Sequence, residues 1–202
     1  MYKIGKDDVK IMTAQIPDYY IYKNDEYKIV ALSKSMNFNP QNYGIIPEEW
    51  ISTACYRGYW CTYCIEDKIL YLKNLSVICK DDIYPSFRGV HASKLEEVGF
   101  SDYYVYKNVN MPMQYTGRIV LGKDFLREYY IHMGYQRAWS YETLLEMVFE
   151  NGVLLDVIDH SNEMKEIRKK IDGDFLQKLR LGDRFVEESF SLDLKEKCWW
   201  FK

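Results

Sequence analysis

Three pairs of strand-like segments, each joined by a short polar turn, are the feature that most restricts what this chain can fold into. Aromatic and β-compatible residues dominate these segments, which is typical of strands. The turn of the third pair contains Asn151-Gly152, the strongest short-range signal for a hairpin. Hairpins imply antiparallel pairing, so we expect an α+β fold with a β-rich antiparallel sheet and one or two short helices. The pairs are residues 19–22 with 27–32, 59–65 with 69–77, and 145–149 with 153–158.

A first helix is predicted over residues 123–131. This segment follows Gly122 and spaces its apolar side chains three and four residues apart. Asp124 is its expected N-cap, and Gly134 is placed where a helix would end.

A second helix is predicted from Ser161, which we expect to be its N-cap. Met164, Ile167 and Ile171 recur at helical spacing and would share one buried face. Gly173 interrupts the pattern, and residues 174–181 are expected to resume it.

The domain organisation follows from length and composition. A chain of 202 residues with 48% hydrophobic residues can bury one substantial core, so we expect a single domain over residues 1–202. Its β-rich body would span 1–160, and a helical C-terminal extension over 161–202 would pack on it. The terminal Trp199-Trp200-Phe201 cluster is expected to fold back onto the body, with an intermolecular anchor as the alternative.

Charge argues against two classes of partner. The net charge of -3 arises from basic and acidic residues interleaved along the chain, so we expect no nucleic-acid binding. Charged residues within 1–16 exclude a signal-peptide core there, and no apolar run of about 18 residues occurs, so we expect a cytoplasmic protein without a membrane span.

The five cysteines are expected to be free thiols packed in the core. Cys61 and Cys64 form a C-x-x-C, but in a strand their side chains would point to opposite faces and could not share a metal ion without a bulge. We therefore expect no metal site, and because the sequence contains no cofactor-binding motif we also expect no cofactor. The remaining cysteines are Cys55, Cys79 and Cys198.

Arg57 is the strongest candidate binding residue. Gly58 predicts a bend or bulge at the start of the second hairpin, where an arginine could bind an anionic group while Tyr59 walls the site. The alternative is that Arg57 stacks on an aromatic ring or pairs with a carboxylate.

Tyr115, Arg118 and His132 complete the set of candidate ligand- or partner-binding residues. Tyr115 and Arg118 precede a strand, a glycine and the first predicted helix, an order that resembles an anion-binding helix N-terminus. His132 lies at the predicted end of that helix, where capping or packing explains it without catalysis. His91 and His160 are expected to be isolated surface residues.

The chain resembles a group of uncharacterised bacterial proteins across roughly residues 10–160. The resemblance implies a bacterial or phage setting and brings no activity. The motifs that carry it are 12–17 (MTAQIP), 52–59 (STACYRGY), 69–72 (ILYL), 115–117 (YTG), 130–135 (YIHMGY) and 149–152 (FENG).

Two functions are consistent with these features. The first is a non-catalytic binding protein of the immunity or defence-associated kind, acting on a partner protein through an aromatic and acidic surface. The second is an enzyme or sensor for a small molecule or nucleotide, with a pocket for a small anionic ligand around Arg57 and His132. The 19 tyrosines fit either a recognition surface or half-buried strands.

Overall fold

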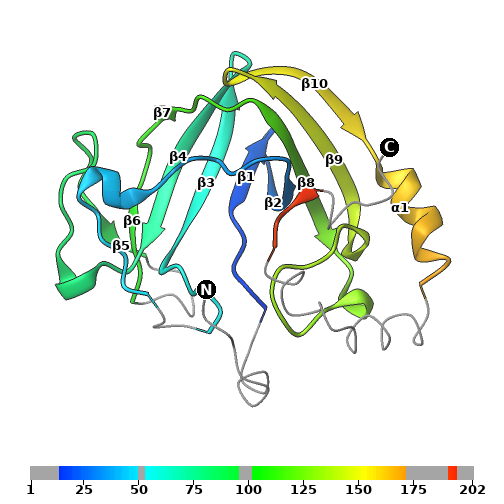
Figure 1. The fold of residues 1–202 in the computed structure, drawn as a ribbon, viewed down its shortest axis with the longest axis horizontal. Helices are drawn as coiled ribbons and strands as arrows, with labels where there is room; N and C mark the ends of the chain where they lie inside the picture. Colours follow the sequence, from blue (N-terminus) through cyan, green and yellow to red (C-terminus); the bar gives the residue numbers. More distant parts are fainter. Residues whose placement is uncertain (1–13, 50–52, 96–101, 172–190, 195–202) are drawn as a thin grey trace.

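The structure, a computed structural model, describes residues 14–49, 53–95, 102–171 and 191–194 (Figure 1). Among these residues lie the helix α1 (Ser161–Arg168) and the 3-10 turns η2 (Pro40–Tyr43), η3 (Lys80–Asp82), η4 (Arg127–Tyr129) and η5 (Ala138–Ser140). The strands are β1 (Tyr19–Tyr22), β2 (Asp25–Leu32), β3 (Tyr59–Glu66), β4 (Ile69–Val77), β5 (Ser93–Lys94), β6 (Tyr104–Tyr106), β7 (Met111–Pro112), β8 (Gly117–Phe125), β9 (Tyr141–Glu150) and β10 (Val153–Asp159).

The three predicted hairpins are present as β1–β2, β3–β4 and β9–β10. Each turns through two residues with positive φ, the geometry that matches the twist of the paired strands. Asn151 and Gly152 adopt it readily, whereas the other two turns place lysines in this left-handed region. The prediction of a strand-rich α+β fold is confirmed.

All ten strands belong to one sheet, with the order β10-β9-β8-β2-β1-β3-β4-β6-β5 and β7 alongside β4. The sheet curls until the β9–β10 turn reaches the β3–β4 turn, where Leu70 N donates to Gly152 O and Leu154 N donates to Lys68 O, both at 2.8 Å. Figure 1 shows the resulting arch, with β3 and β4 on one side, β8, β9 and β10 on the other, and the opening below.

The sheet is mixed, so the expectation of purely antiparallel pairing is wrong. β1 and β3 run parallel, with Tyr19 opposite Thr62 and Ile21 opposite Cys64. β3 lies on the side of β1 away from β2, and it starts at the end of the sheet where β1 starts.

The helix predicted over residues 123–131 is absent. β8 continues to Phe125, which pairs with Tyr141 of β9, and the short turn η4 follows. Cross-strand packing against β9 favours a strand here more strongly than the apolar spacing favours a helix. Asp124 is therefore no N-cap: it has a φ of 59°, and its carboxylate accepts a hydrogen bond from Thr143. Gly134 has positive φ but ends no helix.

The second helix is confirmed as α1. Met164 is fully buried, and Ile167 and Ile171 pack against the same cluster, on the face of the sheet that carries α1. Ser161 is the first helical residue rather than the N-cap, which is His160. The Ser161 hydroxyl instead accepts a hydrogen bond from Leu144 N, at 3.1 Å. Residues 174–181, Cys198 and the Trp199-Trp200-Phe201 cluster lie outside the described residues.

The main core lies inside the arch and contains tyrosines as well as aliphatic residues. Tyr20, Tyr63 and Tyr106 are almost completely buried there, beside leucines of β4. Within the described chain, only Tyr43 and Tyr130 are tyrosines with exposed side chains. The other described tyrosines are therefore buried or half-buried. In the described part of the chain, no helix has the length and apolar character needed to cross a membrane.

Candidate functional site

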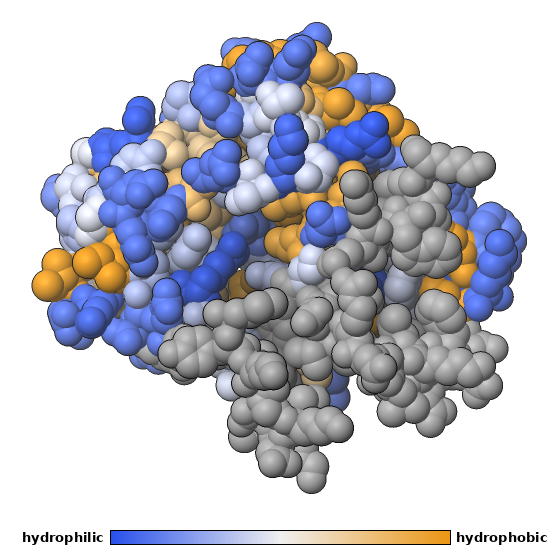
Figure 2. Space-filling model, in the orientation of Figure 1, coloured by the Kyte–Doolittle hydropathy of each residue, from blue (hydrophilic) through white to orange (hydrophobic). Residues whose placement is uncertain are grey.

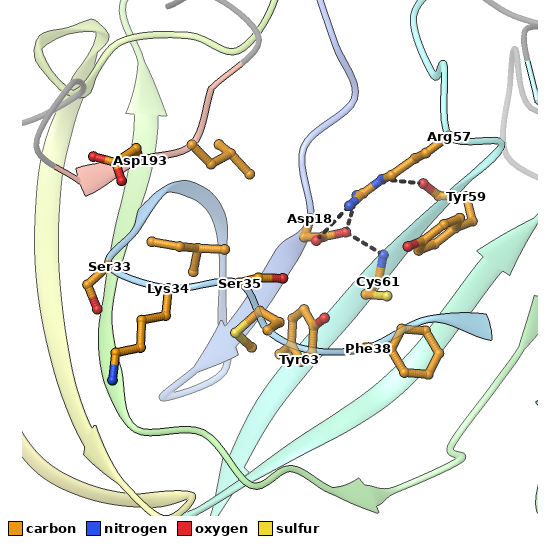
Figure 3. Close-up of a pocket in the computed structure, with 13 residues that line it drawn as sticks. Asp18, Ser33, Lys34, Ser35, Phe38, Arg57, Tyr59, Cys61, Tyr63 and Asp193 are labelled. Atoms are coloured by element: carbon orange, nitrogen blue, oxygen red, sulfur yellow. Dashed lines mark hydrogen bonds and ion pairs between the residues drawn. The ribbon is translucent and has the colours of Figure 1, made fainter. Parts of the chain in front are cut away.

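A cavity of about 330 Å³ lies on the concave side of the sheet (Figure 3). β3 and Asp18, the residue before β1, line its floor, and the segment that follows β2, residues 33–38, crosses over it. In the space-filling view the described surface is hollowed near the centre, with apolar side chains showing between polar ones (Figure 2). The cavity, called here the concave pocket, is lined by Asp18, Leu32, Ser33, Lys34, Ser35, Met36, Phe38, Arg57, Tyr59, Cys61, Tyr63, Leu192 and Asp193.

An ion pair between Asp18 and Arg57 forms one end of the concave pocket. Arg57 Nη2 contacts Asp18 Oδ1, and Nη1 donates to Oδ2 at 3.2 Å, so the contact is bidentate. Arg57 Nε also donates to the backbone oxygen of Tyr59 at 2.8 Å. The Asp18 side chain is only 6% exposed, and its Oδ1 accepts a further bond from Cys61 N at 2.6 Å. These bonds fix both side chains in one orientation.

Gly58 makes this arrangement possible. It has a φ of 71°, and its amide closes a turn by donating to Cys55 O. A Cβ atom at this position would lie 2.2 Å from Glu48 O. The bend expected beside Arg57 is therefore present, and it directs the guanidinium toward Asp18.

Aromatic rings wall the polar end of the concave pocket. The Arg57 guanidinium lies over the Tyr59 ring at 4.8 Å, and Phe38 meets Tyr59 edge-on with ring centroids 6.4 Å apart. Tyr63 lines the floor and is 1% exposed. In Figure 3, Asp18, Arg57, Tyr59 and Tyr63 gather at one end, with Asp193 at the other.

Burial and the ion pair set the protonation of these groups. Burial alone would lower the pKa of Arg57, but the Asp18 carboxylate and smaller contributions from other neighbours together outweigh burial, so the pKa is raised. Burial raises the pKa of the Tyr59 phenol to about 12 and that of the Cys61 thiol well above its ordinary value. At neutral pH the arginine is charged, while the phenol and thiol are protonated.

Only two of the five candidate residues line the concave pocket, namely Arg57 and Tyr59. Tyr115 is buried behind the crossing segment, with its hydroxyl 3.3 Å from Lys34 O and 3.0 Å from Arg118 O. His132 is exposed beside Tyr130 and is not among the residues that line the concave pocket. The helix end expected to hold His132 is absent as well.

Arg118 belongs to a different cluster, centred on Glu146 of β9. One Glu146 oxygen lies 3.1 Å from Arg118 Nη1, and the other lies 2.8 Å from His160 Nε2. His160 Nδ1 in turn lies 2.5 Å from Glu163 on α1. The expectation that His160 is an isolated surface residue is wrong, because its side chain is 12% exposed and joins the start of α1 to β9.

The cysteines agree with the packing expected for them. Cys55, Cys61, Cys64 and Cys79 are free and buried. Cys61 faces the concave pocket, whereas Cys64 is not among its lining residues, consistent with alternation along β3. Among the described residues, no three His, Cys, Asp or Glu side chains are grouped so that they could hold a metal ion.

A second cavity, of about 390 Å³, lies on the other face of β1 and β3. Tyr19, Ile21 and Thr62 line it, and these residues alternate with those that face inward. Its lining does not include Asp18 and Arg57, the bidentate pair of the concave pocket. We therefore take the concave pocket as the candidate site.

Sequence reasoning missed most of this site, including Asp18, Ser35, Phe38 and Tyr63. Asp18 precedes a strand and Ser35 lies in a polar stretch, so neither has a distinguishing local pattern.

Comparisons with protein-family models, curated proteins and solved structures gave no match for this chain.

Proposed function

We propose that this protein is a non-catalytic binding protein that holds a small molecule in the concave pocket. The observation that carries the proposal is the fixed ion pair of Asp18 and Arg57 at the end of a cavity with aromatic walls. Pockets for small molecules combine mainly apolar walls with a few positioned polar groups, in volumes from about 300 Å³ upward. The concave pocket has a volume in this range and a fixed polar pair, and about half of the residues that line it are apolar or aromatic.

The protonation states of the side chains that line the concave pocket favour binding over catalysis. A nucleophilic cysteine needs a lowered thiol pKa, and burial raises that of Cys61. Burial likewise keeps the Tyr59 phenol protonated at neutral pH.

A small molecule is also a better candidate than a partner protein recognised through tyrosines. Among the described residues, nearly all tyrosines are buried or half-buried, with Tyr43 and Tyr130 as the exposed ones. They supply core packing area rather than a recognition surface.

Blocking the concave pocket tests the proposal. Ser35 is exposed at the crossing segment and lines the pocket, so Ser35→Trp would fill part of the cavity. We expect at least one compound from a set of nucleobases, nucleosides, amino acids and aromatic carboxylic acids to stabilise the unaltered protein. A ligand at 100 times its Kd stabilises by about 2.7 kcal/mol, or about 5–10 °C in Tm for a chain of this size. Differential scanning fluorimetry measures this shift.

The matched control is Ser86→Trp, because Ser86 is an exposed serine outside the lining of the concave pocket. We expect Ser35→Trp to abolish the ligand-induced shift and Ser86→Trp to retain it. The proposal fails if no compound stabilises the protein, or if every stabilising compound acts equally on the Ser35→Trp variant.

A further inference from the structure

The charges around the concave pocket balance, which restricts what it can bind. Its ionised side chains are the carboxylates of Asp18 and Asp193 and the cations of Arg57 and Lys34, so their formal charges cancel. Asp18 already neutralises Arg57 through the bidentate contact. In Figure 3 the Lys34 side chain extends away from this pair. A phosphorylated or otherwise strongly anionic ligand would therefore meet no net positive field.

Arg57 and Asp18 can each form further hydrogen bonds beyond those of the ion pair. A guanidinium has five N–H groups, and Arg57 uses three of them in its bonds to described residues. A carboxylate offers about four acceptor positions, and Asp18 Oδ2 accepts only the bond from Arg57 Nη1 among those residues. A donor and an acceptor thus remain side by side at the end of the pocket.

The shape of the walls favours a flat ligand. Tyr59, Phe38 and Tyr63 supply aromatic surface close to the ion pair, and Met36 and Leu192 supply apolar contacts further along. Planar rings gain from offset or edge contacts with aromatic side chains. A cavity of about 330 Å³ accommodates one small heterocycle.

We infer that the concave pocket binds a neutral, planar heterocycle with an adjacent N–H and C=O, the edge found in purine and pyrimidine bases. The ligand N–H would donate to Asp18 Oδ2, and its C=O would accept from Arg57. This inference rests on the proposed function and names its ligand class.

Two methylated forms of one base test the inference in the unaltered protein by isothermal titration calorimetry. Hypoxanthine has an adjacent N–H and C=O; a methyl group on N1 removes that donor, whereas a methyl group on N9 leaves it intact. We expect hypoxanthine and 9-methylhypoxanthine to bind with similar Kd, and 1-methylhypoxanthine to bind at least about tenfold more weakly. Ser35→Trp should abolish all binding.

The outcomes separate the ligand class from the proposed function. Equal binding of the two methylated forms overturns the recognition of this edge. Binding of an aromatic carboxylate but not hypoxanthine, abolished by Ser35→Trp, overturns the ligand class and leaves the proposed function intact. Absence of Ser35-dependent binding for every compound overturns both.

Discussion

Replacing Asp18 with alanine is expected to lower the free energy of unfolding by about 3 kcal/mol, at the lower end of values for broken buried ion pairs. The carboxylate is nearly buried, and its loss leaves both the Arg57 guanidinium and the Cys61 amide without their acceptor. The Arg57 side chain is 31% exposed, so water partly compensates its charge and limits the loss. Urea denaturation followed by circular dichroism measures the change.

The control for this substitution is a second ion pair of the same sheet. Asp25 contacts Lys123 at 3.0 Å, but its side chain is 51% exposed. Surface pairs of this kind contribute about 0–1 kcal/mol, so Asp25→Ala should change stability by less than about 1 kcal/mol. Equal effects of Asp18→Ala and Asp25→Ala would show that the pair at the concave pocket is not fixed as described.

Replacing Gly152 with alanine is expected to destabilise the protein by about 3–4 kcal/mol. Alanine in the left-handed region costs about 1–2 kcal/mol, and Gly152 has a φ of 82°. The added Cβ would also lie 2.2 Å from Met113 O, a backbone atom that cannot rotate away. The turn would have to move from the contacts that close the arch, where Gly152 N donates to Tyr115 O. Thermal or urea unfolding measures the loss.

Gly89 provides a closely matched control. It follows Arg88 in a turn with the same pair of positive φ angles and also has a φ of 82°, but no atom lies within 4 Å of the position that a Cβ would take there. Gly89→Ala should therefore show the backbone cost alone, about 1–2 kcal/mol. If the two alanine variants lose the same stability, the close approach of the β9–β10 turn to residue 113 is incorrect.

Local sequence patterns predicted the elements whose contacts are local. Each hairpin joins strands through two residues, so alternation and turn chemistry were enough to locate it, and Asn151-Gly152 identified the clearest one. The helix at Ser161 was found because Met164 and Ile167 follow its apolar periodicity. The helix prediction over residues 123–131 was wrong because the structure of this segment depends on pairing with β9, which follows later in the chain.

The candidate site could not be assembled from sequence because its residues meet only through tertiary structure. Asp18 and Arg57 are 39 positions apart, and the parallel pairing of β1 with β3 brings them together. Arg57 stood out because Gly58 marked a bend, and the alternative of pairing with a carboxylate was left open. Nothing in the local sequence identified Asp18 as that carboxylate.

A methionine methyl at the concave pocket offers the most direct measurement of binding there. Met36 lines the pocket, whereas Met164 is buried on the face that carries α1. In protein labelled with ¹³C at the methionine methyls, we expect a bound compound from the set above to shift the Met36 signal and leave Met164 unchanged. A spectrum in which no compound moves Met36, or in which Met164 moves as much as Met36, would contradict binding in the concave pocket.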